Sequence, residues 1–351
     1  MKKLTLIISS FAIAFYGNPT SGHIDNFLLP EGCGSCHVGH GETNQPMLAE
    51  SEERFCFQCH GSDDDRSRMI SEGKLSPAAQ LADLDIEFSK PFHHPVEEGF
   101  GHSPVERLPS ASTGTPGHAE CVDCHNPHQR IEQAEKKRYE VSGYSLTGQY
   151  LDIAYYEYEI CLKCHVDYFG YDGTRREITS EFSLSSASQH SVTKPISGEK
   201  LPSLTGFLST VMKCSDCHTN DDPGGPRGPH GSNNQYLLSG NYNLDAVAEE
   251  NPYAYEFCYS CHDRLSILNN ESFPYHREHI SGDTFGERTG TSCYTCHASH
   301  GSRDNSHLIE FNPIAVSPDP NTGLIRYNAT GEGGGECYLT CHGQTHSPGE
   351  Y

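Results

Sequence analysis

The sequence predicts a mostly irregular chain with short α-helices and little strand, wrapped around material other than its own side chains. Three observations lead to this fold class. Only 34% of the 351 residues are apolar and tryptophan is absent, so side chains alone make a poor core. The 34 glycines and 21 prolines favour loops over long elements. All 16 cysteines fall in one short motif that recurs along the chain.

The first 22 residues have the pattern of a secretory signal peptide. A basic start is followed by an apolar run from Leu4 to about Tyr16, and then by small and polar residues to Gly22. The apolar run is shorter than the roughly 20 residues that span a membrane. We therefore expect a mature chain of residues 23–351 without a membrane span, exported to the periplasm or to the cell exterior.

Seven copies of Cys-x-x-Cys-His follow, and an eighth copy has one extra residue between its cysteines. This motif is the attachment site of c-type haem: two thiols bond to the porphyrin edge and the histidine reaches the iron. Zinc ribbons or disulfides are the alternative for such cysteines, but seven identical signatures in an exported chain favour haem. We predict eight covalently attached haem c groups, bound by Cys33, Cys36, Cys56, Cys59, Cys121, Cys124, Cys161, Cys164, Cys214, Cys217, Cys258, Cys261, Cys293, Cys296, Cys337 and Cys341, with iron on His37, His60, His125, His165, His218, His262, His297 and His342.

The eight motifs pair into four modules of two, and residues outside the motifs repeat as well. A histidine, often followed by glycine, comes after the first motif of each module, and three modules continue with two apolar residues. Such self-similarity is typical of a repeat architecture. The predicted modules cover approximately residues 23–75, 90–175, 185–265 and 273–351.

Little regular structure is expected between the motifs. Each motif is predicted to lie on one or two turns of helix, and residues 150–160 to form a helix leading into the fourth motif. The Gly- and Pro-rich stretches 221–231 and 331–335 are predicted loops.

The second iron ligand decides between an electron carrier and an enzyme. Only Met47, Met69 and Met212 remain after the signal peptide, whereas 14 histidines lie outside the motifs, so histidine can complete every site. A histidine three residues after a motif lies on the same side of a helical turn, about 5–6 Å away. It cannot reach the opposite face of its own haem, so it must serve a neighbouring one.

We predict as second ligands four histidines that follow the first motif of a module and four that lie upstream of it: His40, His128, His230 and His300, with His23, His94, His190 and His279. Two adjacent candidates leave a choice, His93 against His94 and His276 against His279, and we favour His94 and His279. His23 and His346 lie near the ends of the mature chain, and ligation across subunits stays open for both.

The repeated unit of a Cys-x-x-Cys-His motif, a nearby histidine and a second motif resembles the doubled-CxxCH family of multihaem c-type cytochromes. The chain is similar to the extracellular cytochrome filament subunits of metal-reducing microbes, which implies secretion, haem c and electron transfer. Two features depart from the pattern: 11 residues separate His218 from His230, and the last motif is stretched.

We therefore expect a secreted octahaem cytochrome that conducts electrons through bis-histidine haems, with no catalytic residues, and that polymerises into a conductive filament. Its expected partners are other redox proteins or extracellular acceptors, and copies of itself. The formal net charge of −23 argues against nucleic acid. The alternative is an octahaem oxidoreductase of a nitrogen or sulfur oxyanion with one open-face haem, for which the stretched eighth site is the best candidate.

Overall fold

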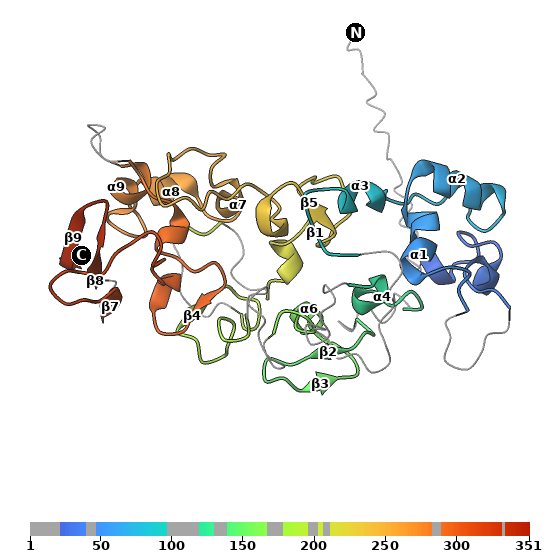
Figure 1. Cartoon of the computed structure of the whole chain (residues 1–351), viewed down its shortest axis with the longest axis horizontal. Helices are drawn as coiled ribbons and strands as arrows, with labels where there is room; N and C mark the ends of the chain where they lie inside the picture. The colour runs from blue at the N-terminus through green and yellow to red at the C-terminus, as the bar shows by residue number, and fades with distance from the viewer. Residues whose placement is uncertain are drawn as a thin grey trace, which may run out of the picture.

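The structure, a computed structural model, describes residues 22–39, 47–96, 119–129, 139–166, 178–195, 203–205, 211–282, 289–331 and 334–351. The predicted signal peptide up to residue 21 and the predicted ligand His40 lie outside these residues. The predicted fold class is confirmed: short helices and small sheets are linked by irregular chain. Successive segments follow the long axis of the molecule, from α1 at one end to β7, β8 and β9 at the other (Figure 1).

Seven of the eight motifs lie on short helices, as predicted. These helices are η2 (Gly32–Ser35), α1 (Glu52–His60), α4 (Cys121–Cys124), α6 (Glu157–Cys161), η4 (Cys214–Asp216), α7 (Glu256–Tyr259) and η6 (Cys293–Thr295). The prediction is wrong for the eighth motif, whose cysteines lie on strand β8 (Gly334–Cys341). The helix expected over residues 150–160 is also shorter, because β3 (Tyr150–Leu151) occupies its first part.

Three of the other helices begin at side chains that cap them. Ser62 accepts a hydrogen bond from a backbone N–H of α2 (Asp63–Ser71), and Asp83 and Asp263 do the same for α3 (Leu84–Phe88) and α8 (Arg264–Leu268). Helix α9 (His276–Ser281) precedes the seventh motif. Three single turns complete the helices of the described residues: η1 (Gly22–Ile24), η5 (Gln235–Leu237) and η7 (Ser306–Leu308).

Two equivalent two-stranded sheets join consecutive predicted modules. Strand β1 (Phe92–His93) pairs with β5 (Gly231–Ser232), and β4 (Ser188–Gln189) pairs with β6 (Gly301–Ser302), all antiparallel. In each sheet a glycine that follows a post-motif histidine has no room for a side chain. A Cβ on Gly231 would lie 1.8 Å from a carbonyl oxygen, and one on Gly301 would lie 2.2 Å from another. The crowding explains why His-Gly recurs in the sequence.

A repeated backbone hydrogen bond explains the apolar pairs found after the first motif of three modules. The backbone N–H after the motif histidine donates to the carbonyl of the first apolar residue, at 2.8 Å in all three modules, as Val38 to Met47, Thr219 to Leu237 and Ala298 to Leu308. The sequence repeat is therefore also a repeat of backbone structure.

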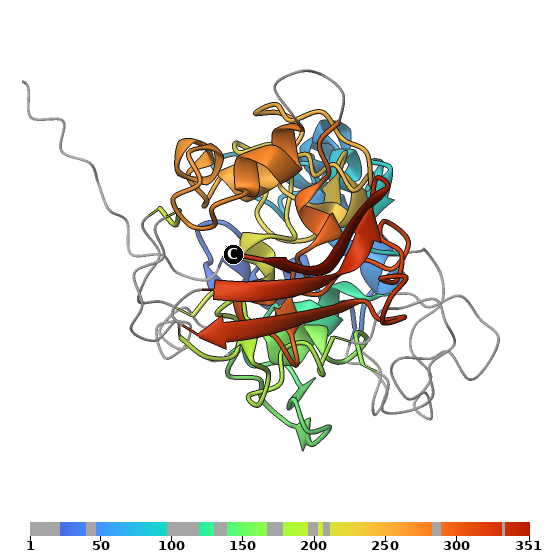
Figure 2. The same cartoon turned by 90° about the vertical axis from the view of Figure 1, so that its left-hand side faces the viewer.

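The C-terminal end is an antiparallel sheet in the order β7-β8-β9, with β7 at Arg326–Gly331 and β9 at Gln344–Glu350. Figure 2 shows this sheet across the end of the molecule. A small hairpin, β2 (Gly143–Tyr144) with β3, lies earlier in the chain. In the described part of the chain, helices are too short or too polar to cross a membrane.

Candidate metal centres

The interior of the molecule is a long cavity rather than a packed core. Buried apolar side chains form small clusters, one of them around Tyr255 and another around Met69. Between the described residues runs a cavity of about 3570 Å³, lined by cysteines of every motif from the second to the eighth. Pockets for a single ligand measure roughly 300–1,000 Å³, so this cavity has room for several large groups. The residues present therefore fit a row of haems.

Sixteen of the described histidines lie in eight ring pairs. Their ring centres are 5.8 to 6.4 Å apart. The pairs are His23–His60, His37–His128, His94–His165, His125–His230, His190–His262, His218–His300, His276–His297 and His279–His346. Both rings of every pair except His37–His128 line the cavity.

This spacing is the one that two axial ligands of a single metal would have. An imidazole nitrogen binds a transition metal at about 2 Å, and the ring centre lies roughly 1.1 Å beyond it, so two trans imidazoles place their ring centres about 6.3 Å apart. Aromatic rings in direct contact also have centres about 4.5–7 Å apart, so these pairs are distinguished by their residues: seven of the eight contain the histidine of a Cys-x-x-Cys-His motif. The rings are thus placed to hold one metal per pair.

The pairs follow one rule along the chain. A post-motif histidine faces the first motif histidine of the preceding module: His128 faces His37, and His230 and His300 follow suit for the next two modules. This agrees with the expectation that such a histidine cannot serve its own motif. In the first three modules, the histidine upstream of the first motif faces the second motif of the same module, as His23 does with His60.

Hydrogen bonds orient many of these rings. The Nδ1 atoms of His94, His190, His218, His279 and His297 each donate to a backbone carbonyl at 2.6 to 2.9 Å. Iron-binding and zinc-binding histidines commonly make this bond, because it fixes the ring and leaves Nε2 free for the metal. His300 Nδ1 instead contacts a carboxylate oxygen of Glu181 at 3.1 Å.

Burial keeps four of the paired imidazoles neutral at pH 7. It lowers the pKa of His60, His230, His262 and His276 to about 4. Neutral imidazole is the form that binds a metal.

Contacts and electrostatic effects indicate that consecutive motifs are neighbours in space. Cys56 and Cys121 have sulfur atoms within 4.8 Å of each other. Burial and the nearby Cys261 raise the pKa of the Cys217 thiol to about 12. Hydrogen bonds join three further pairs of consecutive motifs: Lys163 Nζ with the Asp123 carbonyl at 2.6 Å, Cys161 with Cys214, and Cys258 with Cys293. Electrostatic effects between thiols link the remaining two, Cys36 with Cys56 and Cys296 with Cys337 and Cys341.

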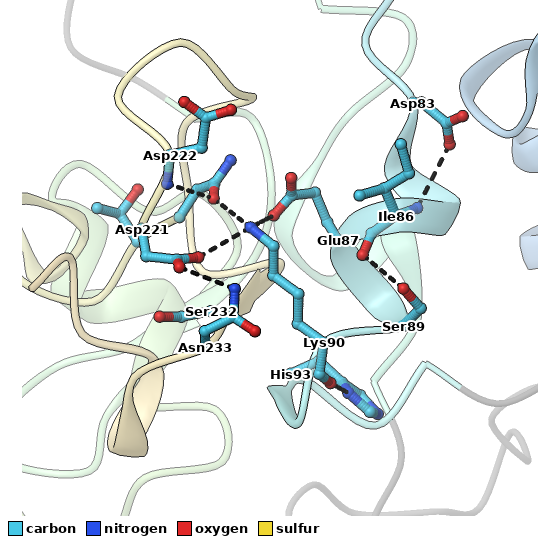
Figure 3. A network of polar contacts seen from close by, with 12 residues as sticks. Asp83, Ile86, Glu87, Ser89, Lys90, His93, Asp221, Asp222, Ser232 and Asn233 are labelled. Atoms are coloured by element: carbon cyan, nitrogen blue, oxygen red, sulfur yellow. Dashed lines mark hydrogen bonds and ion pairs between the residues drawn. The ribbon is translucent and has the colours of Figure 1, made fainter.

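The 11-residue insertion of the third module is tied to the second module through Lys90. Lys90 Nζ lies 2.7 Å from Glu87, 2.9 Å from Asp221 and 2.5 Å from Asn220 (Figure 3). Only 11% of the Lys90 side chain is exposed. Nearby, Phe88 packs edge-on against His230 with ring centres 5.9 Å apart. The insertion therefore helps to fix a paired histidine.

Most predicted second ligands occur in pairs with a motif histidine: His23, His94, His128, His190, His230 and His300. His93 instead is exposed and bonds to the Lys90 carbonyl at 2.6 Å. His279 lies in a pair that contains no motif histidine, and His342 is exposed and does not line the cavity.

Two paired residues, His276 and His346, were candidates in the sequence but not among the eight favoured second ligands, and one supporting repeat was missed. The tripeptide Glu-Phe-Ser occurs at residues 87–89 and 181–183, before His94 and His190. In both copies the phenylalanine ring packs against a post-motif histidine. The ring centres of Phe182 and His300 are 5.1 Å apart, and Phe88 packs against His230. The repeated tripeptide was the signal that could have located these contacts.

Two family models match the chain. The model of outer membrane cytochromes that are MtrC/MtrF-like, domains II/IV, matches residues 147–308, and the doubled CXXCH motif model matches residues 29–65. No curated protein and no solved structure matches it. With motifs for covalent haem, paired histidines and these two matches, the chain is a multihaem c-type cytochrome related to the cytochromes of extracellular electron transfer.

Proposed function

We propose that this cytochrome carries electrons along eight bis-histidine haem c groups that follow one another in sequence order. The observation that carries the proposal is the set of eight histidine pairs, with ring centres 5.8 to 6.4 Å apart. When bound, haem c supplies reversible one-electron chemistry at its iron. The contacts between motif cysteines of consecutive sites support transfer between neighbours.

The axial ligands follow from the pairs. The first sites of the four modules take His37 with His128, His125 with His230, His218 with His300, and His297 with His276. The second sites of the first three modules take His60 with His23, His165 with His94, and His262 with His190. These residues would hold each iron with two imidazoles, and bis-histidine ligation gives lower potentials than a methionine ligand does.

The finer part of the proposal is that the protein is exported and that its copies associate end to end. The first and last motifs lie at opposite ends of the molecule (Figure 1), which supports a path that continues from one copy to the next. His23 and His346 each face a histidine of their own chain. End-to-end association would therefore not require a ligand donated by another subunit. Electron microscopy of secreted material tests this part. A field that contains dispersed particles and no filaments, at a high protein concentration, would count against end-to-end association.

The alternative function, reduction of a nitrogen or sulfur oxyanion, needs one iron with an open face. The pairing of sixteen histidines into eight sets of two favours the carrier, because it offers a second ligand at every site. Intact mass and low-temperature EPR of the purified holoprotein test the choice. We expect eight haems and low-spin ferric signals throughout. A high-spin ferric signal in the wild type, together with turnover of nitrite or sulfite, would contradict the electron-carrier function and favour the reductase.

A further inference from the structure

Two glutamates occupy the same place at successive junctions between modules. At each junction, the first cysteine of a second motif lies beside the first cysteine of the next module. These cysteine pairs are Cys56–Cys121, Cys161–Cys214 and Cys258–Cys293. Glu52 and Glu157 each precede the second motif of their module by four residues. Residues four apart lie on one face of a helix, so each glutamate shares a face of its helix with the junction cysteine.

Both carboxylates also bond to the helix of the next module. Val122 and Ser215 each follow the first cysteine of a motif. The backbone N–H of Val122 donates to Glu52 Oε1 at 3.1 Å. Ser215 donates to Glu157 through its backbone N–H at 2.7 Å and through its hydroxyl at 2.9 Å. Backbone N–H groups in the first turn of a helix have no partner within it. The two contacts are therefore equivalent, and each carries a carboxylate across a junction.

The two carboxylates lie close to the sulfur atoms that bond to the porphyrin edge when haem is attached. An oxygen of Glu52 and the sulfur atoms of Cys56 and Cys121 lie within 4.8 Å of one another. A hydrogen bond with its junction partner, burial and the charge of Glu157 raise the pKa of the Cys161 thiol. Among the described residues, neither glutamate forms an ion pair with a lysine or an arginine. Their negative charge therefore acts on the junction itself.

The third junction lacks such a carboxylate. The residue four before Cys258 is Ala254, which is 6% exposed and lies in an apolar cluster with Tyr255. Cys258 and Cys293 pack against the same cluster. The acidic residue closest to Cys258 in the sequence, Glu256, is exposed. A charged contact that recurs at two junctions is thus replaced by apolar side chains at the third.

A negative charge beside a haem favours the oxidised state. Ferric haem carries one more positive charge than ferrous haem, so an anion stabilises the ferric state and lowers the reduction potential. A charge about 10 Å from an iron, at an effective dielectric constant near 20, changes the ratio of oxidised to reduced haem roughly tenfold. One carboxylate at a junction acts on both haems that meet there.

We propose that Glu52 and Glu157 tune the relay: their charges lower the potentials of the second to fifth haems, counted in motif order, relative to the sixth and seventh. The proposal rests on the haem-relay function above and adds to it a gradient of potential along the chain. The sixth and seventh haems meet at the junction without a carboxylate. A partly reduced molecule would therefore hold its electrons at this junction.

Spectroelectrochemical titration of the purified holoprotein tests the proposal. Glu157→Gln keeps an oxygen that accepts the hydrogen bonds of Ser215 but removes the charge. We expect two of the eight one-electron steps to move to higher potential, so that at a fixed potential the ratio of reduced to oxidised haem rises roughly tenfold for these two haems. Glu157→Asp keeps the charge and is expected to keep the potentials of the wild type.

Glu52→Gln is the second test, and it decides the matter if Glu157→Gln does not fold. Burial, followed by the charges of Glu53 and Glu120, raises the pKa of Glu52 to about 7. The titrations are therefore made at about pH 8.5, where Glu52 is charged. We again expect two steps to move to higher potential.

Glu256→Gln is the matched control. This carboxylate is exposed, two residues before Cys258, and its charge is screened by solvent and salt. Unchanged potentials in Glu157→Gln and Glu52→Gln, or an equal shift in Glu256→Gln, would overturn the proposal. Intact mass and EPR of the wild type keep this failure apart from a failure of the relay. Fewer than eight haems, or a high-spin haem, would contradict the relay, whereas the tuning is decided by the potentials alone.

Discussion

At the scale of the residue, Lys90 shows how one charge joins two modules. It lies between Glu87, on the helix before His94, and Asp221, in the insertion that precedes His230. The Glu87 side chain is only 6% exposed. Removing the ammonium group would leave a buried carboxylate without its partner, which costs more than the loss of an exposed pair.

Lys90→Met is therefore expected to destabilise the protein by about 2 kcal/mol, because Glu87 loses its counter-charge. Thermal unfolding followed by circular dichroism measures the change. Lys74→Met is the matched control, since Lys74 pairs with Glu72 in an exposed contact at 2.8 Å. The explanation fails if the two variants unfold at the same temperature.

The ion pair between Lys90 and Asp221 predicts that the stability of the protein depends on pH. Burial alone would raise the pKa of Asp221, but hydrogen bonds from Lys90 and Asn233 outweigh burial and lower it. A folded pKa below the ordinary value of about 3.9 gives stabilisation that is complete above that pH and is lost as the pH falls through the lowered pKa. The difference in unfolding temperature between wild type and Lys90→Met should be constant from about pH 5 to 8 and shrink below about pH 4. A difference that grows in acid would contradict this sign.

Some ligands could be predicted residue by residue and others could not. His94 corresponds to His190 because both stand one residue before a small or proline residue and two before valine, and the register agrees, with His93 opposite Gly231 and Gln189 opposite Gly301. The sequence left a choice between His276 and His279, and the structure places each of them opposite another histidine. Because one upstream histidine was assigned to each module, the sequence prediction had no place for a second one in the fourth module.

At the scale of the element, the short cross-module sheets hold the post-motif histidines in place. The strand pairs are only two residues long, so their positions depend on close backbone packing. Gly301 lies against the Glu181 carbonyl, and His300 precedes it directly. A side chain at position 301 must push the two segments apart.

Gly301→Ala is therefore expected to lower the unfolding temperature by roughly 5 °C or more. It should also convert one haem to high spin, since His300 would move away from His218. Circular dichroism and EPR measure the two effects. Gly224→Ala is the control, because the nearest atom to its Cβ would be 3.4 Å away. Equal behaviour of both variants would rule out the packing argument.

The helices of seven motifs could be predicted because the motif itself sets their local geometry. The strand of the eighth could not, because cysteines four residues apart also fit one face of a helix, and the strand depends on pairing with β7 and β9 on either side. Contacts such as Lys163 with Asp123 join motifs 40 residues apart, so the spatial order of sites was also beyond local patterns.

At the scale of the whole molecule, the net charge of −23 determines how the protein interacts with a charged partner at long range. Such a field attracts cationic partners over distances set by the Debye length, about 30 Å at 0.01 M salt and 3 Å at 1 M. The second-order rate of reduction by a small basic cytochrome should fall about tenfold or more between these two salt concentrations. Stopped-flow absorbance measures it. An acidic electron donor should show the opposite trend, and a rate independent of salt for both donors would exclude steering by charge.

The dependence of one module on the next has a consequence for how the chain is made. The first site of each of the first three modules finds its second histidine in the following module, as His37 does in His128. A growing or shortened polypeptide would therefore always end in a site with one ligand missing. The fourth module closes the series with His276, which precedes its own seventh motif. It resembles the terminal cap of a repeat protein in this respect. If the pairs hold haem iron, a chain cut within an earlier module would leave an iron with an open face that can react with oxygen or peroxide.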